Sequence, residues 1–144
     1  MKKFITLNKY GELYIDKILF ETYFPIIFTC KNENNDIFIC VCCQCNENGC
    51  KWLVGRTNGS FIVRMLQNEI TIRQLLLDCC TEKISVDYKN QEYAIAYNNS
   101  DWNEESDYLP KKDAYIDAEG GEFDEEIAYF TSIEHVEYNE EYYK

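Results

Sequence analysis

The chain lacks the long apolar segments that would mark a membrane or secreted protein. Its longest apolar runs, such as Phe24–Phe28 and Ile37–Cys43, are far shorter than the roughly 20 residues that a bilayer-spanning helix needs. The opening residues, MKKFITLNKYGELY, hold too few consecutive apolar side chains for the core of a signal peptide. We therefore expect the protein to remain in the cytoplasm.

Signatures of catalysis are also missing. The sequence contains no glycine-rich phosphate loop, no G-x-S-x-G and no H-E-x-x-H, which are the short motifs that carry a known mechanism. His135 is the single histidine and lies in an acidic segment remote from every cysteine. A solvated surface histidine is therefore favoured over a Cys–His nucleophile pair. We expect no enzymatic activity and no cofactor, and an enzyme of a class without a recognisable motif stays an alternative.

Proline and glycine are scarce, with two and six residues in a chain of 144. No linker rich in proline, glycine or serine divides the sequence, and this length suits one domain with a single core. We expect one domain over residues 1–144. Its charge-balanced part, residues 1–99, is expected to form the core, and residues 100–144 an acidic, tyrosine-rich segment.

Strand patterns dominate the first 60 residues. Lys3–Asn8 and Leu13–Phe20 have the composition of strands or of a lead-in to a sheet. Pro25–Cys30 and Ile37–Cys45 are rich in β-branched, aromatic and thiol side chains and flank a polar stretch, which predicts a hairpin. Lys51–Arg56 is expected to add a third strand to this antiparallel meander.

Helical spacing follows the meander. We expect a helix from Ser60, its N-cap, to about Gln67, and a second short helix that begins with a capping box of Thr71 and Gln74. The predicted fold class is α+β. It consists of an antiparallel sheet, two short helices after the third or fourth strand, and an acidic C-terminal segment packed on the sheet.

The last part of the chain is less regular. Ile84–Tyr88 and Glu92–Tyr97 flank a short polar connection and predict a second hairpin. Ala114–Ile116 has a strand-like pattern. Glu122–Glu137 fits either a helix or a strand, and its length favours a helix.

Two segments resemble a family of small bacterial domains of unknown function. They are LYIDKILFETYFPIIFTCK at Leu13–Lys31 and NEITIRQLL at Asn68–Leu76, where the family has a "YDxPxLF" strand and a "GxITLRDAF"-like segment bracketing a sheet. The chain has Thr22-Tyr23-Phe24-Pro25 where the aspartate of that strand is expected. The resemblance covers about the first two-thirds of the chain, and it implies a fold but no activity.

The negative charge is confined to the last third of the chain. Residues 100–144 hold fifteen acids against three lysines, a net charge of −12, whereas residues 1–99 hold eleven of each sign. Disordered acidic tails are poor in aromatic residues, but this segment contains nine of them, including Trp102, Phe123 and Tyr129. We therefore expect a folded anionic surface. Such a surface disfavours direct binding to nucleic acid or anionic lipid and favours a basic protein partner.

A rigid array of carboxylates can imitate a phosphate backbone, and tyrosines supply contact area between the charges. We therefore expect a non-enzymatic inhibitor that docks on a basic, nucleic-acid-binding partner such as a defence nuclease or a toxin. Anti-defence proteins carried by phages, anti-CRISPR proteins among them, and nuclease-immunity proteins are of this type. The expected partner-binding residues are Glu104, Glu105, Asp107, Tyr108, Glu119, Glu122, Asp124, Glu125, Glu126, Tyr129, Glu134, Glu137, Tyr138, Glu140 and Glu141. The alternative is a scaffold domain whose acids form only a solvated face.

Five of the eight cysteines fall between Phe38 and Cys50, in FICVCCQCNENGC. The overlapping C-x-x-C pairs are Cys40/Cys43 and Cys42/Cys45, and in a regular strand neither pair lies on one face. A zinc site needs four ligands that converge on one ion. Because cytosolic thiols are normally reduced and behave as small hydrophobes, we expect free thiols of the core and no bound metal. A cysteine-based metal or redox protein stays an alternative.

Overall fold

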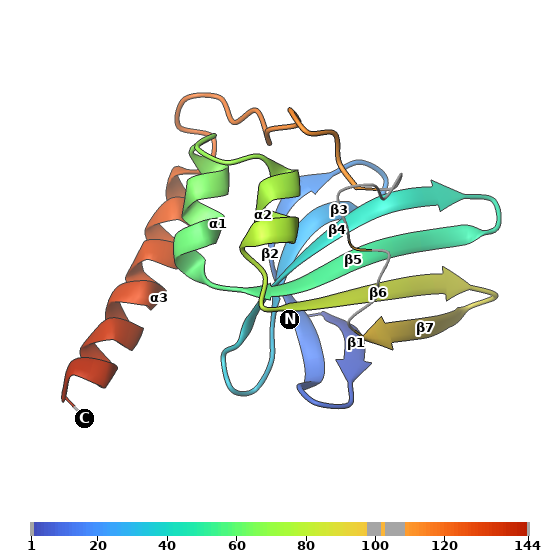
Figure 1. The fold of residues 1–144 in the computed structure, drawn as a ribbon, viewed down its shortest axis with the longest axis horizontal. Helices are drawn as coiled ribbons and strands as arrows, with labels where there is room; N and C mark the ends of the chain where they lie inside the picture. Colours follow the sequence, from blue (N-terminus) through green and yellow to red (C-terminus); the bar gives the residue numbers. More distant parts are fainter. Residues whose placement is uncertain (1, 98–101, 103–108, 144) are drawn as a thin grey trace.

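The computed structural model shows one antiparallel sheet of seven strands that follow one another in sequence order (Figure 1). It describes the backbone of residues 2–97, 102 and 109–143, and the side chains in these ranges up to residue 133. The strands are β1 (Lys3–Leu7), β2 (Gly11–Glu21), β3 (Pro25–Lys31), β4 (Ile37–Asn46), β5 (Gly49–Thr57), β6 (Glu82–Lys89) and β7 (Glu92–Tyr97). The helices are α1 (Gly59–Leu66), α2 (Ile72–Asp78) and α3 (Asp124–Tyr143).

The sheet curls until its two edge strands lie close together, with β1 beside β7 (Figure 1). The backbone N–H of Asn8 donates to the hydroxyl of Tyr97 at 2.7 Å. The rings of Phe4 and Tyr93 meet edge to face with centroids 5.9 Å apart. These contacts join the two edges, so the sheet is nearly a barrel.

The concave face of the sheet encloses the inner core. Leu13, Phe28, Phe38, Val54 and Val86 are buried there, together with residues of every strand from β1 to β6. In each strand the next residue points to the opposite face, because strand side chains alternate with a period of two. The sheet therefore has two apolar faces, and the second face also needs a cover.

Helices α1, α2 and α3 provide that cover on the convex face, where Figure 1 shows them together on one side of the sheet. The outer core combines strand residues such as Ile39 and Leu53 with Ile62 of α1, Leu75 of α2 and Phe130 of α3. Trp102 also belongs to this core, and its indole N–H donates to the Ser85 hydroxyl at 3.1 Å. Among the described residues no helix is both long and apolar enough to cross a bilayer.

Side-chain caps fix the starts of α1 and α2. The capping box of Thr71 and Gln74 is confirmed, with the Gln74 N–H donating to the Thr71 hydroxyl at 3.0 Å and the Thr71 N–H donating to the Gln74 side chain at 2.8 Å. The cap of α1 is Asn58 and not Ser60, because the side-chain oxygen of Asn58 accepts from the Phe61 N–H at 3.0 Å. An asparagine two residues upstream is as good a cap as serine.

The C-terminal segment is helical from Asp124 to Tyr143, which confirms the helical interpretation of its pattern. Phe123 and Phe130 are buried in the outer core, and Ile127 and Ile133 pack against it. These positions recur at helical spacing, so one stripe of the helix faces the sheet side. The predicted strand at 114–116 does not form, and the Ala114 carbonyl instead accepts a hydrogen bond from the Ile72 N–H at the start of α2, at 3.0 Å.

The predicted fold class is wrong. The seven predicted strand segments join one sheet that is nearly a barrel, both short helices follow β5 rather than the third or fourth strand, and a third helix ends the chain. The predicted position of the helices was wrong because Lys3–Asn8 and Leu13–Phe20 could be interpreted either as strands or as a lead-in to the sheet. Their pattern is ambiguous because register shifts interrupt the alternation of β2 at three places in its pairing with β3. A bulge inserts an extra residue and breaks the period-two pattern on which strand prediction depends.

Candidate functional site

Five exposed acidic side chains lie close together in sequence just ahead of and at the start of α3. We call residues 117–125 the acidic turn, because five exposed carboxylates occur within these nine residues. They belong to Asp117, Glu119, Glu122, Asp124 and Glu125. Two of them, Asp124 and Glu125, lie in the first turn of α3, where negative charge is favoured by the helix dipole.

Hydrogen bonds to the end of α1 hold the acidic turn in place. The side-chain amide of Asn68 donates to the Ala118 carbonyl at 3.1 Å, and the Ala118 N–H donates back to the Asn68 side-chain oxygen at 3.2 Å. Within the turn, the Glu119 N–H donates to the Glu122 carboxylate at 3.0 Å. Phe123 is buried between the exposed acids. The carboxylates are therefore displayed from a backbone that is fixed on both sides.

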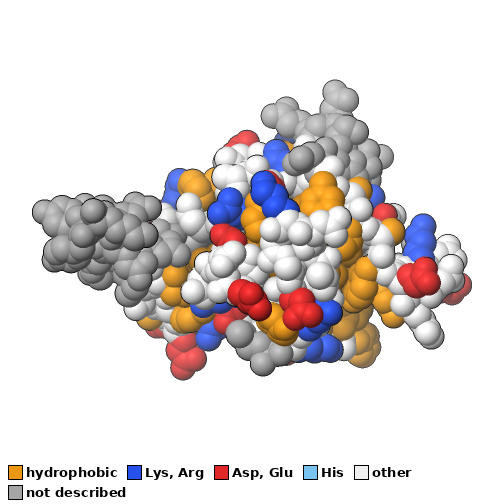
Figure 2. Space-filling view, turned by 90° about the horizontal axis from the view of Figure 1, so that it is seen from below, with side chains coloured by type: hydrophobic (Ala, Val, Ile, Leu, Met, Phe, Trp, Pro, Cys, Tyr) orange, Lys and Arg blue, Asp and Glu red, His pale blue; other side chains and the backbone are white. Residues whose placement is uncertain are grey.

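No ion pair is formed by the acidic turn with any other described residue, since the four ion pairs of the described chain all lie between residues of the first 82. On the face drawn in Figure 2, by contrast, acidic and basic side chains are interspersed with exposed apolar ones. Five uncompensated carboxylates in a fixed turn create a local negative potential that attracts a cationic surface.

Tyr129 was predicted to contact a partner, but the structure places it against the sheet. Its hydroxyl donates to the Asp16 carboxylate at 2.5 Å. The ammonium groups of Lys17 and Lys31 lie 4.5 and 5.0 Å from its ring centroid. Burial, followed by the hydrogen bond and charge of Asp16, raises the pKa of Tyr129 well above its ordinary value. Tyr129 thus anchors α3 to β2 and β3.

Replacing Tyr129 by phenylalanine is expected to lower the free energy of unfolding by about 1 kcal/mol at pH 7, the usual size of a lost hydrogen bond. The folded-state pKa of Tyr129 lies above the unfolded value of about 10, so its stabilisation is complete below pH ~10 and declines as the pH rises toward the folded value. Urea unfolding at pH 8 and at pH 11 should therefore show the difference between wild type and Tyr129→Phe shrinking at the higher pH. Tyr115→Phe, at a more exposed tyrosine, is the control, and a pH-independent difference would contradict this anchor.

The other predicted partner-binding residues divide into two groups. Glu126 is half-buried, and one of its carboxylate oxygens is buried without a hydrogen-bond partner among the described residues, so it does not belong to the exposed set. The rest lie outside the described side chains, and they are Glu104, Glu105, Asp107, Tyr108, Glu134, Glu137, Tyr138, Glu140 and Glu141.

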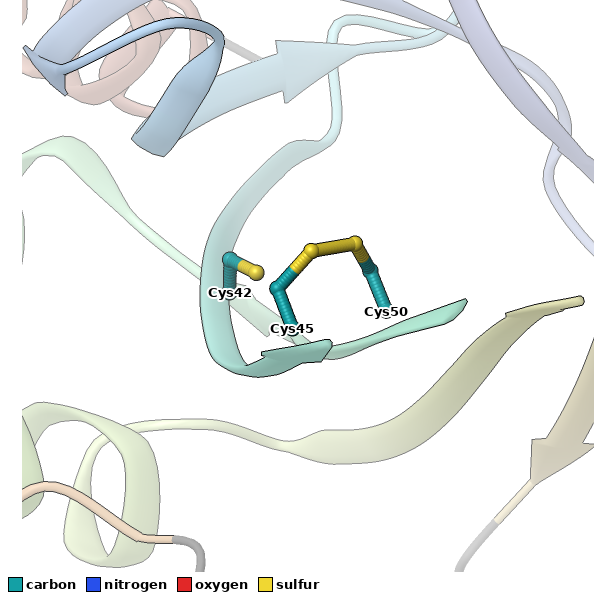
Figure 3. A group of neighbouring side chains, drawn as sticks. All are labelled: Cys42, Cys45 and Cys50. Carbon is teal, nitrogen blue, oxygen red and sulfur yellow. A yellow bond between two sulfur atoms is a disulfide. The ribbon is translucent and has the colours of Figure 1, made fainter. Parts of the chain in front are cut away.

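A second candidate site lies beside the turn that joins β4 to β5. The sulfur atoms of Cys42, Cys45 and Cys50 all lie within 4.8 Å of one another (Figure 3). A bulge makes this possible: Cys42 pairs with Trp52 and Gln44 pairs with Lys51, which leaves Cys43 as the extra residue. Beyond a one-residue bulge the two faces exchange. The prediction that neither C-x-x-C pair shares a face is therefore wrong for Cys42 and Cys45.

The expectation of free thiols throughout is also corrected, because Cys45 and Cys50 form a disulfide. They are a directly opposed pair of the hairpin, with Cα atoms 4.1 Å apart. Six cysteines are free. Among these, Cys30 and Cys40 fit the expected role of core thiols, since both are buried in the inner core with sulfur atoms 3.7 Å apart.

An aromatic pocket of about 320 Å³ adjoins the cysteine cluster. Its walls include Phe4, Phe24, Trp52 and Tyr93, and Cys50 contributes to its lining. This pocket gives the cluster an apolar neighbourhood on one side, while Cys45 on the other side is exposed. The cluster is therefore accessible from solvent and partly sheltered from it.

No protein-family model, no curated protein and no solved structure matches this chain. The resemblance to small bacterial domains therefore stays a prediction, and function has to be argued from the two sites themselves.

Proposed function

We propose that this chain is a non-catalytic binding protein whose acidic turn docks on a basic surface of a partner protein. The observation that carries the proposal is the acidic turn itself: five exposed carboxylates without an ion-pair partner among the described residues, on a backbone fixed by Asn68. The setting that we propose is the cytoplasm of a bacterial cell.

Charge without preorganisation would favour solubility rather than recognition. Long charged side chains on a mobile backbone lose conformational entropy when they dock, and that loss offsets much of the Coulomb attraction. Here the buried Phe123 and the paired bonds between Asn68 and Ala118 hold the backbone before any partner arrives. The remaining cost is limited to the side chains, so the turn can distinguish one basic surface from another.

A partner that grips nucleic acid is the basic surface best suited to this turn. Such proteins present lysine and arginine side chains spaced to meet successive phosphates. Carboxylates that occupy those positions exclude the nucleic acid by competition. In this proposal the chain is an inhibitor of the anti-defence or nuclease-immunity type. Its activity consists of occupying the partner's groove and involves no chemical step.

The test compares wild type with two variants that change the net charge by the same amount. In the turn variant, the five acids of the acidic turn become their amides; Glu122→Gln keeps the oxygen that accepts from the Glu119 N–H. The matched control neutralises five exposed acids elsewhere, namely Glu21, Glu33, Glu69, Asp78 and Glu92. Each protein is immobilised, bacterial lysate is passed over it at about 50 and 200 mM salt, and captured proteins are identified by mass spectrometry.

We expect wild type and the control variant to capture the same nucleic-acid-binding protein, and the turn variant to lose at least about tenfold in affinity, which is ~1.4 kcal/mol. A double-stranded oligonucleotide should displace the partner, and capture should weaken at the higher salt. Equal capture by the turn variant would show that the acids form only a solvated face, as in the scaffold alternative. Capture that an oligonucleotide does not disturb would contradict mimicry of a phosphate backbone.

A further inference from the structure

The hairpin end that carries Cys42, Cys45 and Cys50 has a geometry that core packing does not explain. Cys45 is exposed, and Cys42 and Cys50 are half-buried, whereas a cysteine that serves as a small hydrophobe is normally buried, like Cys30 and Cys40. Three sulfur atoms of one hairpin converge, because Cys45 and Cys50 are an opposed, disulfide-bonded pair and a bulge at Cys43 turns Cys42 to the same side as Cys45 (Figure 3).

We propose that, when the Cys45–Cys50 disulfide is reduced, Cys42, Cys45 and Cys50 bind one thiophilic d¹⁰ metal ion, Cu(I) or Zn(II). This assignment is independent of the acidic turn. Soft thiolate ligands select these ions over harder ones. The disulfide makes the site redox-dependent, since two of the three ligands are unavailable while they are bonded to each other.

The distances fit such an ion once reduction lets the Cys45 and Cys50 side chains rotate apart. A metal–sulfur bond of about 2.3 Å in tetrahedral geometry places the ligand sulfur atoms ~3.8 Å apart. The three sulfur atoms lie within 4.8 Å of one another, and after reduction the Cys45 and Cys50 sulfurs have to move apart from bonding distance to the ligand spacing. Three protein ligands leave a trigonal site for Cu(I), or one open position that water completes for Zn(II). Three cysteines are therefore enough for either ion, and a fourth cysteine ligand is not required.

The surroundings favour a retained ion. Cys50 and Trp52 line the aromatic pocket, so apolar side chains flank one side of the cluster and restrict the approach of water. An apolar shell of this kind controls solvent access to a metal and tunes its properties.

A cellular dithiol is the reductant that opens the disulfide. The dithiol transfers two electrons and two protons to the Cys45–Cys50 disulfide and is itself oxidised to a disulfide. The three thiols then release three protons to solvent as they bind the ion, which is the usual coupling of metal binding to thiol ionisation. In the reverse direction the oxidised dithiol takes back two electrons from Cys45 and Cys50 and two protons from solvent, the Cys45–Cys50 disulfide closes, Cys42 regains a proton and the ion is released.

The experiment uses the full chain under anaerobic conditions after reduction with a phosphine. Cu(I) is titrated in competition with a colorimetric Cu(I) chelator, and Zn(II) in competition with a zinc indicator. The variants are Cys42→Ser, Cys45→Ser and Cys50→Ser, singly and together. Cys43→Ser is the matched control, because Cys43 is the adjacent free thiol that is absent from the cluster. Circular dichroism establishes that each variant is folded.

We expect one ion per reduced chain for wild type and for Cys43→Ser, and at least a tenfold loss of affinity in each of the three cluster variants. Re-oxidised wild type should release the ion. The proposal is overturned if reduced wild type holds neither ion more tightly than the triple variant, or if Cys43→Ser loses as much as Cys42→Ser.

A second readout needs no substitution. Alkylation of reduced wild type with N-ethylmaleimide, followed by peptide mass spectrometry, should show that the ion protects Cys42, Cys45 and Cys50. The half-buried Cys79 serves as the internal reference and should react equally with and without metal. If Cys42, Cys45 and Cys50 are labelled to the same extent with and without the ion, as Cys79 is, the proposed site is contradicted. This outcome does not depend on whether a serine variant folds.

Discussion

Replacement of Phe130 by alanine is expected to lower the free energy of unfolding by about 3–5 kcal/mol, the usual cost of truncating a fully buried aromatic side chain. Phe130 is wholly inaccessible to solvent and is the central contact of α3 with the outer core. Its ring also meets that of Tyr129 edge to face, with centroids 5.0 Å apart. Chemical denaturation monitored by circular dichroism measures the change.

Thr131→Ala provides the control for Phe130→Ala, since Thr131 is the next residue of α3 and is exposed. Its effect should stay within about 0.5 kcal/mol, as for most surface substitutions. Similar small effects for both variants would mean that α3 does not stabilise the fold. In that case the acidic turn would also lose one of its two attachments, and the docking proposal would lose its structural basis.

The sequence could predict those elements in which local pattern and tertiary structure agree. The hairpins β3–β4 and β6–β7 were recognisable because polar turns separate segments of strong β-propensity. The capping box at Thr71 was recognisable because it is local by nature. The spacing within Glu122–Glu137 fits both a helix and a strand, and the length of this segment favoured the helix that forms. For the hairpins and the capping box the deciding interactions lie within a few residues of one another.

Register and long-range attachment could not be predicted in this way. The bulge at Cys43 reverses the alternation of β4 and brings Cys42 beside Cys45. The composition of this cysteine-rich strand does not indicate an extra residue. Tyr129 was predicted to face a partner, yet it bonds Asp16, which is 113 positions away. A turn rich in carboxylates was visible in the sequence, but its fixation by Asn68 depends on contacts between distant segments.

Gly55 of β5 is a position that only glycine can occupy without displacing a neighbour. A Cβ atom added to Gly55 of β5 would lie 2.4 Å from the Cys80 sulfur and 3.0 Å from the Cys80 Cβ. The connection from α2 to β6 crosses β5 at this point. Cys80 is held there by a contact of its sulfur with the Leu75 carbonyl oxygen at 3.3 Å, and burial raises the pKa of its thiol to about 12.

Gly55→Ala is therefore expected to lower the free energy of unfolding by about 2–3 kcal/mol, the upper range for overpacking a filled interior. The clash is specific to one neighbour, so Cys80→Gly should relieve it. In the double variant the total loss should be smaller than the sum of the two single losses by about 1 kcal/mol or more, because residues in contact are energetically coupled. Urea denaturation of the four proteins measures this coupling.

Gly120→Ala shows whether these losses come from the clash or from glycine replacement as such. Gly120 has open space around its Cα and a backbone conformation accessible to other residues, so alanine there should be neutral or slightly stabilising. Strictly additive losses at Gly55 and Cys80 would mean that the connection after α2 can move away from β5. The coupled result would instead establish that this crossing is fixed, and with it the position of α2 and of the outer core on which α3 and the acidic turn rest.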